Sequence, residues 1–216
     1  MTDPAFAAED DAVEVPAEAA EAVVEAGRRM DLRNWVPATS GNLSVRLDAH
    51  SLAITRSGVH KGRLEAEDVI PVDLDGRMLA EWGRLSVETP LHCQIYRLFP
   101  EAGAVLHGHS VAGTVLSMLP GPGLALAGYE VMKAFGGQPG HEGRLVVPVV
   151  ENEQDVARLA ATLAPILPAA RAGYLVRGHG TYVWGADMDT AFARLEALEF
   201  LLECELARRR LNGTSQ

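Results

Sequence analysis

The sequence predicts one α/β domain in which helices cover a mixed, largely antiparallel sheet. Helical and extended patterns alternate along the chain, several extended segments are close enough to form hairpins, and no glycine-rich dinucleotide-binding turn follows a strand. With 216 residues, of which 48% are apolar, the chain can build a single core. We expect this domain over residues 17–212, after a disordered, acidic and alanine-rich tail at 1–16.

Apolar spacing predicts one helix and several strands in the first part of the chain. Apolar residues three or four apart mark the helix, and strict alternation after a polar glycine turn marks a half-buried strand. Asp75-Gly76 is a pair typical of hairpin turns. The expected elements are a helix at 16–34, a strand at 43–48, its return strand at 52–55, and hairpin arms at 69–74 and 77–80.

The rest of the chain alternates helices with short strands. Pro90 fits the first turn of a helix, and Ser110 fits the N-cap of another. The last helix carries its apolar residues on one stripe. The expected elements are helices at 88–99, 110–119, 153–167 and 187–210, strands at 102–109, 145–149, 174–179 and 181–184, and a loop at 120–123.

Composition argues against several functional classes. The net charge is −10 and no lysine- or arginine-rich stripe crosses the body of the chain, so we expect no nucleic-acid partner. No apolar stretch approaches the ~20 residues that span a bilayer, and the N-terminus lacks the basic region of a signal peptide. Cys93 and Cys204 fall in helical patterns without CxxC spacing, as buried thiols of a cytoplasmic protein would.

Three histidines at the ends of apolar runs are the strongest functional pattern. His107 and His109 are two residues apart in an extended segment, so their side chains point the same way, and His179 ends a second apolar run. Three protein ligands with a position left open are typical of a catalytic divalent metal. An all-imidazole set favours zinc, with manganese, iron and cobalt as alternatives. The remaining histidines, at positions 50, 60, 92 and 141, are expected to be solvated or hydrogen-bonded.

Small polar turns form a second pattern. The turns at Ser40-Gly41-Asn42 and Ser57-Gly58 punctuate strands, and Ser86 precedes a helix. Backbone N–H groups, hydroxyls and a helix N-terminus can converge on an anion in such places, and Lys61 can add a positive charge. Each of these turns alone is more often only a turn, so the prediction depends on their convergence.

Two glutamates are candidates for proton transfer. Glu88 precedes a helix, where a carboxylate is also a routine capping residue. Glu130 has apolar neighbours on both sides, so we expect a partly desolvated carboxylate with a raised pKa. An exposed helical glutamate is the alternative interpretation.

The histidine segments and the polar turns described above resemble the class II aldolase/adducin family. The resemblance runs in order along the chain from about residue 18 to residue 210. The resemblance implies a homotetramer of three-layer α/β/α sandwiches, a metal ion bound by the three histidines, and phosphate bound at Gly41-Asn42, Ser57-Gly58 and Ser86. It also implies that Glu88 is an acid/base and a metal ligand in the empty enzyme. The segments that carry the resemblance are Thr39–Ser44, Arg56–Gly58, Ala104–Ser110 and Leu175–Gly180.

Segments 86–92, 128–133 and 195–205 are similar to a dehydratase branch of that family. This narrower resemblance implies zinc-dependent dehydration of 5-methylthioribulose 1-phosphate in methionine salvage, with Glu130 as the acid/base. The chain departs from the aldolase Ser-Ser-Glu pattern by placing Val87 between Ser86 and Glu88, which removes one phosphate hydroxyl. A sugar-phosphate retro-aldolase, a pentulose-phosphate 4-epimerase and a non-enzymatic adducin-like interaction domain are the alternatives.

Overall fold

Helices cover both faces of one eight-stranded sheet in a computed structural model, which describes residues 13–136 and 142–213. The strands lie in the order β3-β2-β1-β4-β8-β7-β6-β5, and neighbouring strands pair antiparallel except β6 with β7. The predicted mixed, largely antiparallel sheet is therefore confirmed. The strands are β1 Asn42–Arg46, β2 Ser51–Thr55, β3 Val69–Asp73, β4 Ala104–Gly108, β5 Gly123–Ala127, β6 Arg144–Val150, β7 Tyr174–Val176 and β8 Gly180–Gly185.

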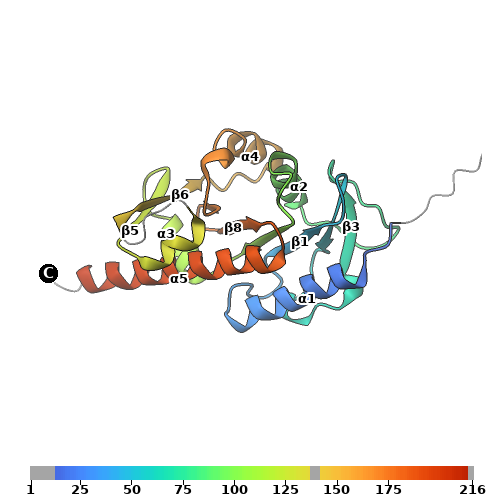
Figure 1. The fold of residues 1–216 in the computed structure, drawn as a ribbon, viewed down its shortest axis with the longest axis horizontal. Coiled ribbons are helices and arrows are strands. Elements are labelled where there is room, and N and C mark those ends of the chain that lie inside the picture. The colour runs from blue at the N-terminus through green and yellow to red at the C-terminus, as the bar shows by residue number, and fades with distance from the viewer. Residues whose placement is uncertain (1–12, 137–141, 214–216) are drawn as a thin grey trace, which may run out of the picture.

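The α-helices form the two outer layers. Figure 1 shows α1 and the long α5 along one face of the sheet, with α2 and α4 together on the other. Two clusters of buried apolar residues, one on each side of the sheet, correspond to this arrangement. The three-layer sandwich is therefore confirmed. The α-helices are α1 Ala17–Leu32, α2 Thr89–Leu98, α3 Val111–Ser117, α4 Val156–Leu163 and α5 Met188–Gly213, and the short 3-10 helices are η1 Lys61–Arg63, η2 Ala66–Asp68, η3 Glu130–Phe135 and η5 Leu167–Ala169.

Local patterns account well for the helices. The predicted stripe of α5 is buried at Ala191, Leu195, Leu198 and Leu202, each 0% exposed. Ser110 caps α3, since its hydroxyl accepts a hydrogen bond from the Gly113 backbone N–H.

Three sequence predictions about strands need correction. The strand predicted to be half-buried is β1, and Ser44 on its polar face is 0% exposed because helices cover both faces of the sheet. The predicted hairpin turn forms at Gly76, but its second arm makes only an isolated bridge, between Val72 and Met78. The strand β5 was missed because small residues and the preceding Pro-Gly loop hide the alternation of buried Leu124 and Leu126.

The helix predicted over 153–167 is shorter than expected. Asp155 caps α4 by accepting hydrogen bonds from the N–H groups of Ala157 and Arg158. The helix ends at Leu163 because Pro165, two residues later, lacks the N–H donor that would continue the helical hydrogen bonds. A separate 3-10 helix, η5, follows.

Part of the predicted N-terminal tail and one of the histidines lie outside the residues that the structure describes. Residues 1–12 of the predicted tail and His141 lie outside the described residues, and α1 begins at Ala17. No helix in residues 13–136 and 142–213 is both long and apolar enough to cross a membrane. Cys93 and Cys204 are free thiols; Cys93 is buried and Cys204 is partly exposed.

Candidate metal and phosphate site

The sheet brings the three predicted histidines together. His107 is near the end of β4, His109 follows that strand directly, and His179 lies in the turn between β7 and β8. The ring centroid of His109 lies 4.6 Å from the centroid of each of the other two rings. The centroids of His107 and His179 are 5.1 Å apart. One ligand atom from each residue lies within 4.8 Å of the others. This is a compact donor set contributed by two neighbouring parts of the sheet.

His107 is held in one tautomer by the backbone. Its Nδ1 lies 3.0 Å from the carbonyl oxygen of Thr181, which can only accept a hydrogen bond. The ring therefore carries its hydrogen on Nδ1 and directs the Nε2 lone pair into the cluster. The side chain is 0% exposed, so water does not compete for that lone pair.

The spacing of the imidazole nitrogens suits a shared cation. The Nε2 atoms of His107 and His109 are 2.9 Å apart. Since zinc–nitrogen bonds are about 2.0–2.1 Å long, two imidazole nitrogens on one ion lie about 3 Å apart. The separation of these two nitrogens is thus close to that of two ligands on one ion.

The imidazoles are electrically suited to bind a cation. Burial, with the neighbouring imidazoles, holds the pKa of His107 well below its usual value. Burial and His179 lower the pKa of His109 to about 4, against the opposing effect of Glu88. Both rings are therefore neutral near pH 7, as metal ligands must be.

His179 retains bonding capacity. Its Nδ1 is buried and has no hydrogen-bond partner among the described residues. Its Nε2 lies 3.3 Å from Oε1 of Glu88. Because buried polar atoms are normally bonded, the unsatisfied nitrogen is consistent with a further ligand at this cluster.

Glu88 is the carboxylate that lies against the imidazoles. It occupies the N-cap position of α2, and its side chain is 16% exposed. Its Oε1 is 3.5 Å from His107 Nε2, on the same side as His179, while its Oε2 accepts a hydrogen bond from Asn42 Nδ2 at 2.7 Å. Three imidazoles and one carboxylate form a donor set that fits a divalent ion of the zinc type.

Glu130 lies elsewhere on the subunit. It opens η3, its side chain is 62% exposed, and it forms an ion pair with Lys133. The expected desolvation is therefore wrong for the single chain. The reason is that Met132 and Phe135, and not Glu130, occupy the buried face of η3.

The first predicted phosphate turn packs directly against the imidazole cluster. Asn42 pairs with His107 across the β1–β4 ladder. Gly41 has a φ of +74°, and a Cβ there would lie 2.6 Å from the carbonyl oxygen of His107. Only glycine allows this close approach. Asn42 Nδ2 also lies 3.4 Å from Ser86 Oγ, so two of the predicted phosphate-binding segments meet.

The second predicted turn joins the same region. Ser57 follows β2, and its backbone N–H donates to the Arg84 carbonyl oxygen at 2.7 Å. The Arg84 guanidinium donates in turn to Ser57 Oγ at 3.2 Å. Gly58 has a φ of +83°, with nothing within 4 Å of an added Cβ, so this turn faces open space. Arg84 is not predicted as a site residue from the sequence, because an isolated exposed arginine belongs to no local pattern.

The buried ammonium group of Lys61 bonds to the backbone beside the first two predicted turns. It is 2% exposed, and its ammonium group donates to the carbonyl oxygens of Thr39 and Val59 at 2.8 Å each. Burial lowers the pKa of Lys61 to about 8, although Glu88 and Asp68 favour its charged form. Lys61 therefore connects the segments beside the first two predicted turns.

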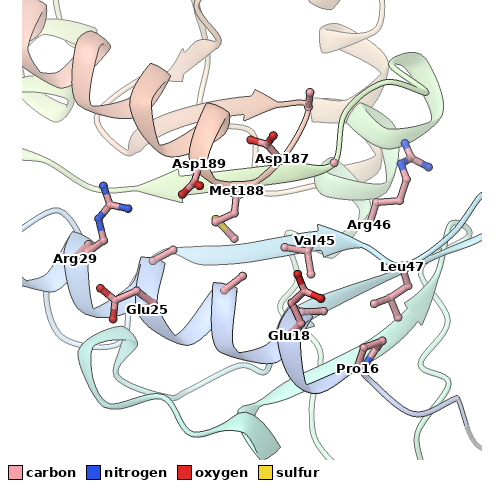
Figure 2. A pocket seen from close by; sticks show the side chains of 15 residues that line it. Pro16, Glu18, Glu25, Arg29, Val45, Arg46, Leu47, Asp187, Met188 and Asp189 are labelled. Carbon is pink, nitrogen blue, oxygen red and sulfur yellow. The ribbon is translucent and has the colours of Figure 1, made fainter.

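Two cavities show where a ligand can enter. A cavity of about 270 Å³ is lined by Glu88 and His179, with Leu91 and Asn152. A larger one, about 600 Å³, lies between α1, β1 and the start of α5, and the side chains that line it include Glu25, Arg29 and Asp189 (Figure 2). The smaller cavity is the candidate site because His179 and Glu88, which lie against the other two imidazoles, line it.

Comparisons with known proteins agree with this geometry. The family model described as Class II Aldolase and Adducin N-terminal domain matches residues 21–206. The chain is 57% identical, over 202 residues, to a methylthioribulose-1-phosphate dehydratase of Acidiphilium cryptum, covering 93% of this chain and 96% of the relative. It is 59% identical, over 187 residues, to a protein of the same name from Gluconobacter oxydans, covering 86% and 90% of the two chains.

Solved structures with the same fold include an aldolase. The L-fuculose-1-phosphate aldolase of Thermus thermophilus superposes with a TM-score of 0.75 at 27% identity, covering 91% of this chain and 98% of that one. A putative aldolase, epimerase or decarboxylase of Klebsiella pneumoniae has a TM-score of 0.75 at 26% identity, covering 88% and 89%.

Proposed function

The chain belongs to the class II aldolase and adducin family, and we propose that it dehydrates 5-methylthioribulose 1-phosphate. The product is 2,3-diketo-5-methylthiopentyl 1-phosphate, an intermediate of methionine salvage. The observation that carries the proposal is the near full-length identity of 57% with a methylthioribulose-1-phosphate dehydratase, in a chain that retains three converging imidazoles. The retained histidines also argue against an adducin-like domain without catalytic activity.

The proposed metal ligands are His107, His109 and His179. The fixed tautomer of His107 and the neutral state of His109 support this assignment. Zinc, one ion per subunit, is the proposed metal because three imidazoles match its ligand preference. A divalent ion held there would supply Lewis-acid polarisation of the carbonyl group of the ketose.

The proposed phosphate contacts are Gly41, Asn42, Ser57, Gly58 and Ser86. The hydrogen bonds that connect these turns support a shared anion site, and Lys61 contributes positive charge behind them. Anchoring the phosphate orients the reacting carbons over the imidazole cluster, since positioning alone removes much of the entropic barrier.

Proton transfer is assigned to Glu130. Its carboxylate takes the proton from C3, and the carboxylic acid then protonates the hydroxyl that leaves C4 as water. The enol that results ketonises to the diketone. Glu88 is bonded through Oε2 to Asn42 and holds Oε1 beside the imidazoles, where it can serve as a further ligand in the absence of substrate.

The exposed position of Glu130 connects the mechanism to assembly. Since its side chain is 62% exposed on its own chain, we propose that subunits of a homotetramer pack so that Glu130 lies at the mouth of a neighbouring site. The proposed location is the cytoplasm, whose reducing conditions suit the free thiols Cys93 and Cys204.

The direct test is product analysis on the purified, zinc-loaded protein. Incubation with 5-methylthioribulose 1-phosphate should yield a diketone that absorbs in the ultraviolet. Glu130→Gln should abolish turnover without loss of bound metal, while Glu67→Gln, which changes an exposed glutamate of η2, should keep wild-type activity. Full activity of Glu130→Gln would reject its assignment, and absence of the diketone with wild-type protein would reject the proposed reaction.

A sugar-phosphate aldolase is the second candidate. The observation that favours it is that Glu88, and not Glu130, contacts the imidazoles within the chain. An aldolase would use the same metal-binding and phosphate-binding residues, but it would cleave the C3–C4 bond and release dihydroxyacetone phosphate and an aldehyde. A 4-epimerase would rejoin that bond. Detection of triose phosphate in place of the diketone would favour the aldolase.

A further inference from the structure

A buried line of polar side chains joins α2 to β1 beneath the imidazole cluster. Glu88, His92 and Tyr96 are spaced by four residues, so they share one face of α2. Asn42 and Ser44 are spaced by two, so they share one face of β1. The two faces meet, and hydrogen bonds connect all five side chains.

His92 is the centre of this line. It is 0% exposed, and both of its ring nitrogens are bonded: Nδ1 to Ser44 Oγ at 2.7 Å, and Nε2 to Asn42 Oδ1. Its ring meets the Tyr182 ring edge-on at 5.9 Å, and Tyr182 stacks on His107 with a centroid distance of 4.0 Å. The sequence expectation that His92 is hydrogen-bonded holds, but the residue is buried next to the site.

The donor and acceptor in each hydrogen bond of this line can be assigned by starting from Glu88. A carboxylate only accepts, so Asn42 must present its amide N–H to Oε2 and turn its carbonyl oxygen to His92. His92 then donates from Nε2, which leaves Nδ1 to accept from the Ser44 hydroxyl. The Tyr96 hydroxyl, 2.9 Å away, donates to Ser44. All the donors point toward Glu88, an arrangement in which neighbouring bonds polarise one another.

This arrangement controls which group faces Glu88. An asparagine amide can flip by rotation, exchanging its oxygen for its nitrogen. A flipped Asn42 would place its carbonyl oxygen against the Glu88 carboxylate, and the two acceptors would repel each other. The same flip would bring the Asn42 amide N–H against the N–H of His92, so His92 adds a second barrier to it. Oε2 of Glu88 therefore stays bonded, and Oε1 stays 3.3–3.5 Å from the imidazole nitrogens of His179 and His107.

We propose that His92 is a positioning residue that acts through Asn42 to hold the Glu88 carboxylate beside the metal-binding imidazoles. The proposal rests on the proposed function for its kinetic consequence, but its geometric consequence does not depend on which reaction the protein catalyses. A fully buried histidine must find a partner for each ring nitrogen, a cost that an apolar residue at this position would avoid.

The test compares His92→Gln with His92→Asn in the full-length protein. The amide N–H of glutamine can reach the position of Nε2 and bond Asn42, whereas asparagine reaches only the position of Nδ1. Gln94→Leu is the matched control, since Gln94 is also buried on α2 but donates to the Ala160 carbonyl oxygen, away from the site. Each variant is loaded with Co²⁺, whose visible absorption spectrum responds to its ligands, and Glu88→Gln provides the reference spectrum.

We expect His92→Asn to shift the Co²⁺ spectrum toward that of Glu88→Gln and to weaken Co²⁺ binding about 10- to 100-fold. The kcat should fall by a similar factor while KM stays near the wild-type value. His92→Gln should restore both the spectrum and most of kcat. Gln94→Leu should retain the wild-type spectrum.

A folded His92→Asn variant with the wild-type spectrum and Co²⁺ affinity would overturn the proposal, as would a Gln94→Leu variant that reproduces its spectrum. If His92→Asn does not fold, His92→Gln decides the question, because a changed spectrum in that variant contradicts the proposed role of the donated hydrogen bond. The spectra remain decisive even if the wild-type protein fails to dehydrate the proposed substrate, so the two proposals fail separately.

Discussion

The Nδ1–H of His107 donates a hydrogen bond to the backbone carbonyl oxygen of Thr181, at 3.0 Å, between neighbouring strands. A backbone acceptor cannot rotate away as a side chain can, so the sheet itself sets the orientation of this imidazole. The same contact keeps the Nε2 lone pair directed toward His109 and His179.

Metal binding should depend on the cluster and not on histidine content in general. His109→Ala removes one of three proposed ligands, and the purified variant should lose most of its bound zinc, measured by elemental analysis. His50→Ala, which changes an exposed histidine, should keep full zinc content. Full zinc occupancy in His109→Ala would contradict the assigned site.

The first predicted phosphate turn lies so close to β4 that a side chain added at Gly41 should lower the free energy of unfolding. Gly41→Ala places a methyl group 2.6 Å from the His107 carbonyl oxygen at a φ of +74°, so we expect a loss of about 2–5 kcal/mol in the free energy of unfolding. Gly76→Ala has a similar φ, +83°, but meets no atom within 4 Å, and should lose only about 1 kcal/mol.

Urea denaturation of the two glycine variants and the wild type measures both effects. Equal losses for the two variants would mean that backbone strain alone, and not contact with His107, accounts for the change.

The buried carboxyl of Glu199 should make stability depend on pH. Glu199 on α5 is 0% exposed and accepts a hydrogen bond from Thr181 Oγ1 at 3.1 Å. Burial raises its pKa from 4.5 to about 7. Between these values the unfolded chain loses the proton while the folded chain keeps it. The contribution of Glu199 to stability therefore falls as the pH rises through this window, and levels off above about 7.

Glu199→Gln removes this titration. From about pH 4 to pH 8, the free energy of unfolding of the variant should improve relative to wild type by up to about 3 kcal/mol. Denaturation curves across that range measure the difference. Parallel pH profiles for the two proteins would show that Glu199 ionises as easily in the fold as in the unfolded chain.

Lys61 should make phosphate binding depend on pH. Because burial lowers its pKa to about 8, the ammonium loses its proton between pH 7 and pH 9, and KM for the phosphorylated substrate should rise over that interval. At pH 7, Lys61→Met should have a KM about tenfold above that of the wild type. The KM of this variant should change little between pH 7 and pH 9.

Arg63→Met removes an exposed cation two residues away and should retain the wild-type pH profile of KM. A pH-independent KM in the wild-type protein would contradict the role of the Lys61 charge.

Much of the fold follows from patterns that each segment carries within itself. The spacing in α5 already identifies the face that is buried, and the two-residue interval between His107 and His109 already places their rings on one side. These properties repeat with the period of a helix or a strand, so they are legible in short stretches of chain.

The partners of each segment depend on strand order, which no local period encodes. Placing β1 beside β4 and β4 beside β8 brought Asn42 and Thr181 to His107, and the covering of both faces buried Ser44. The same packing placed Glu88 against the imidazoles and left Glu130 at the surface. Contacts between distant segments arise from how layers meet, and for that reason the assembled fold alone assigned these neighbours.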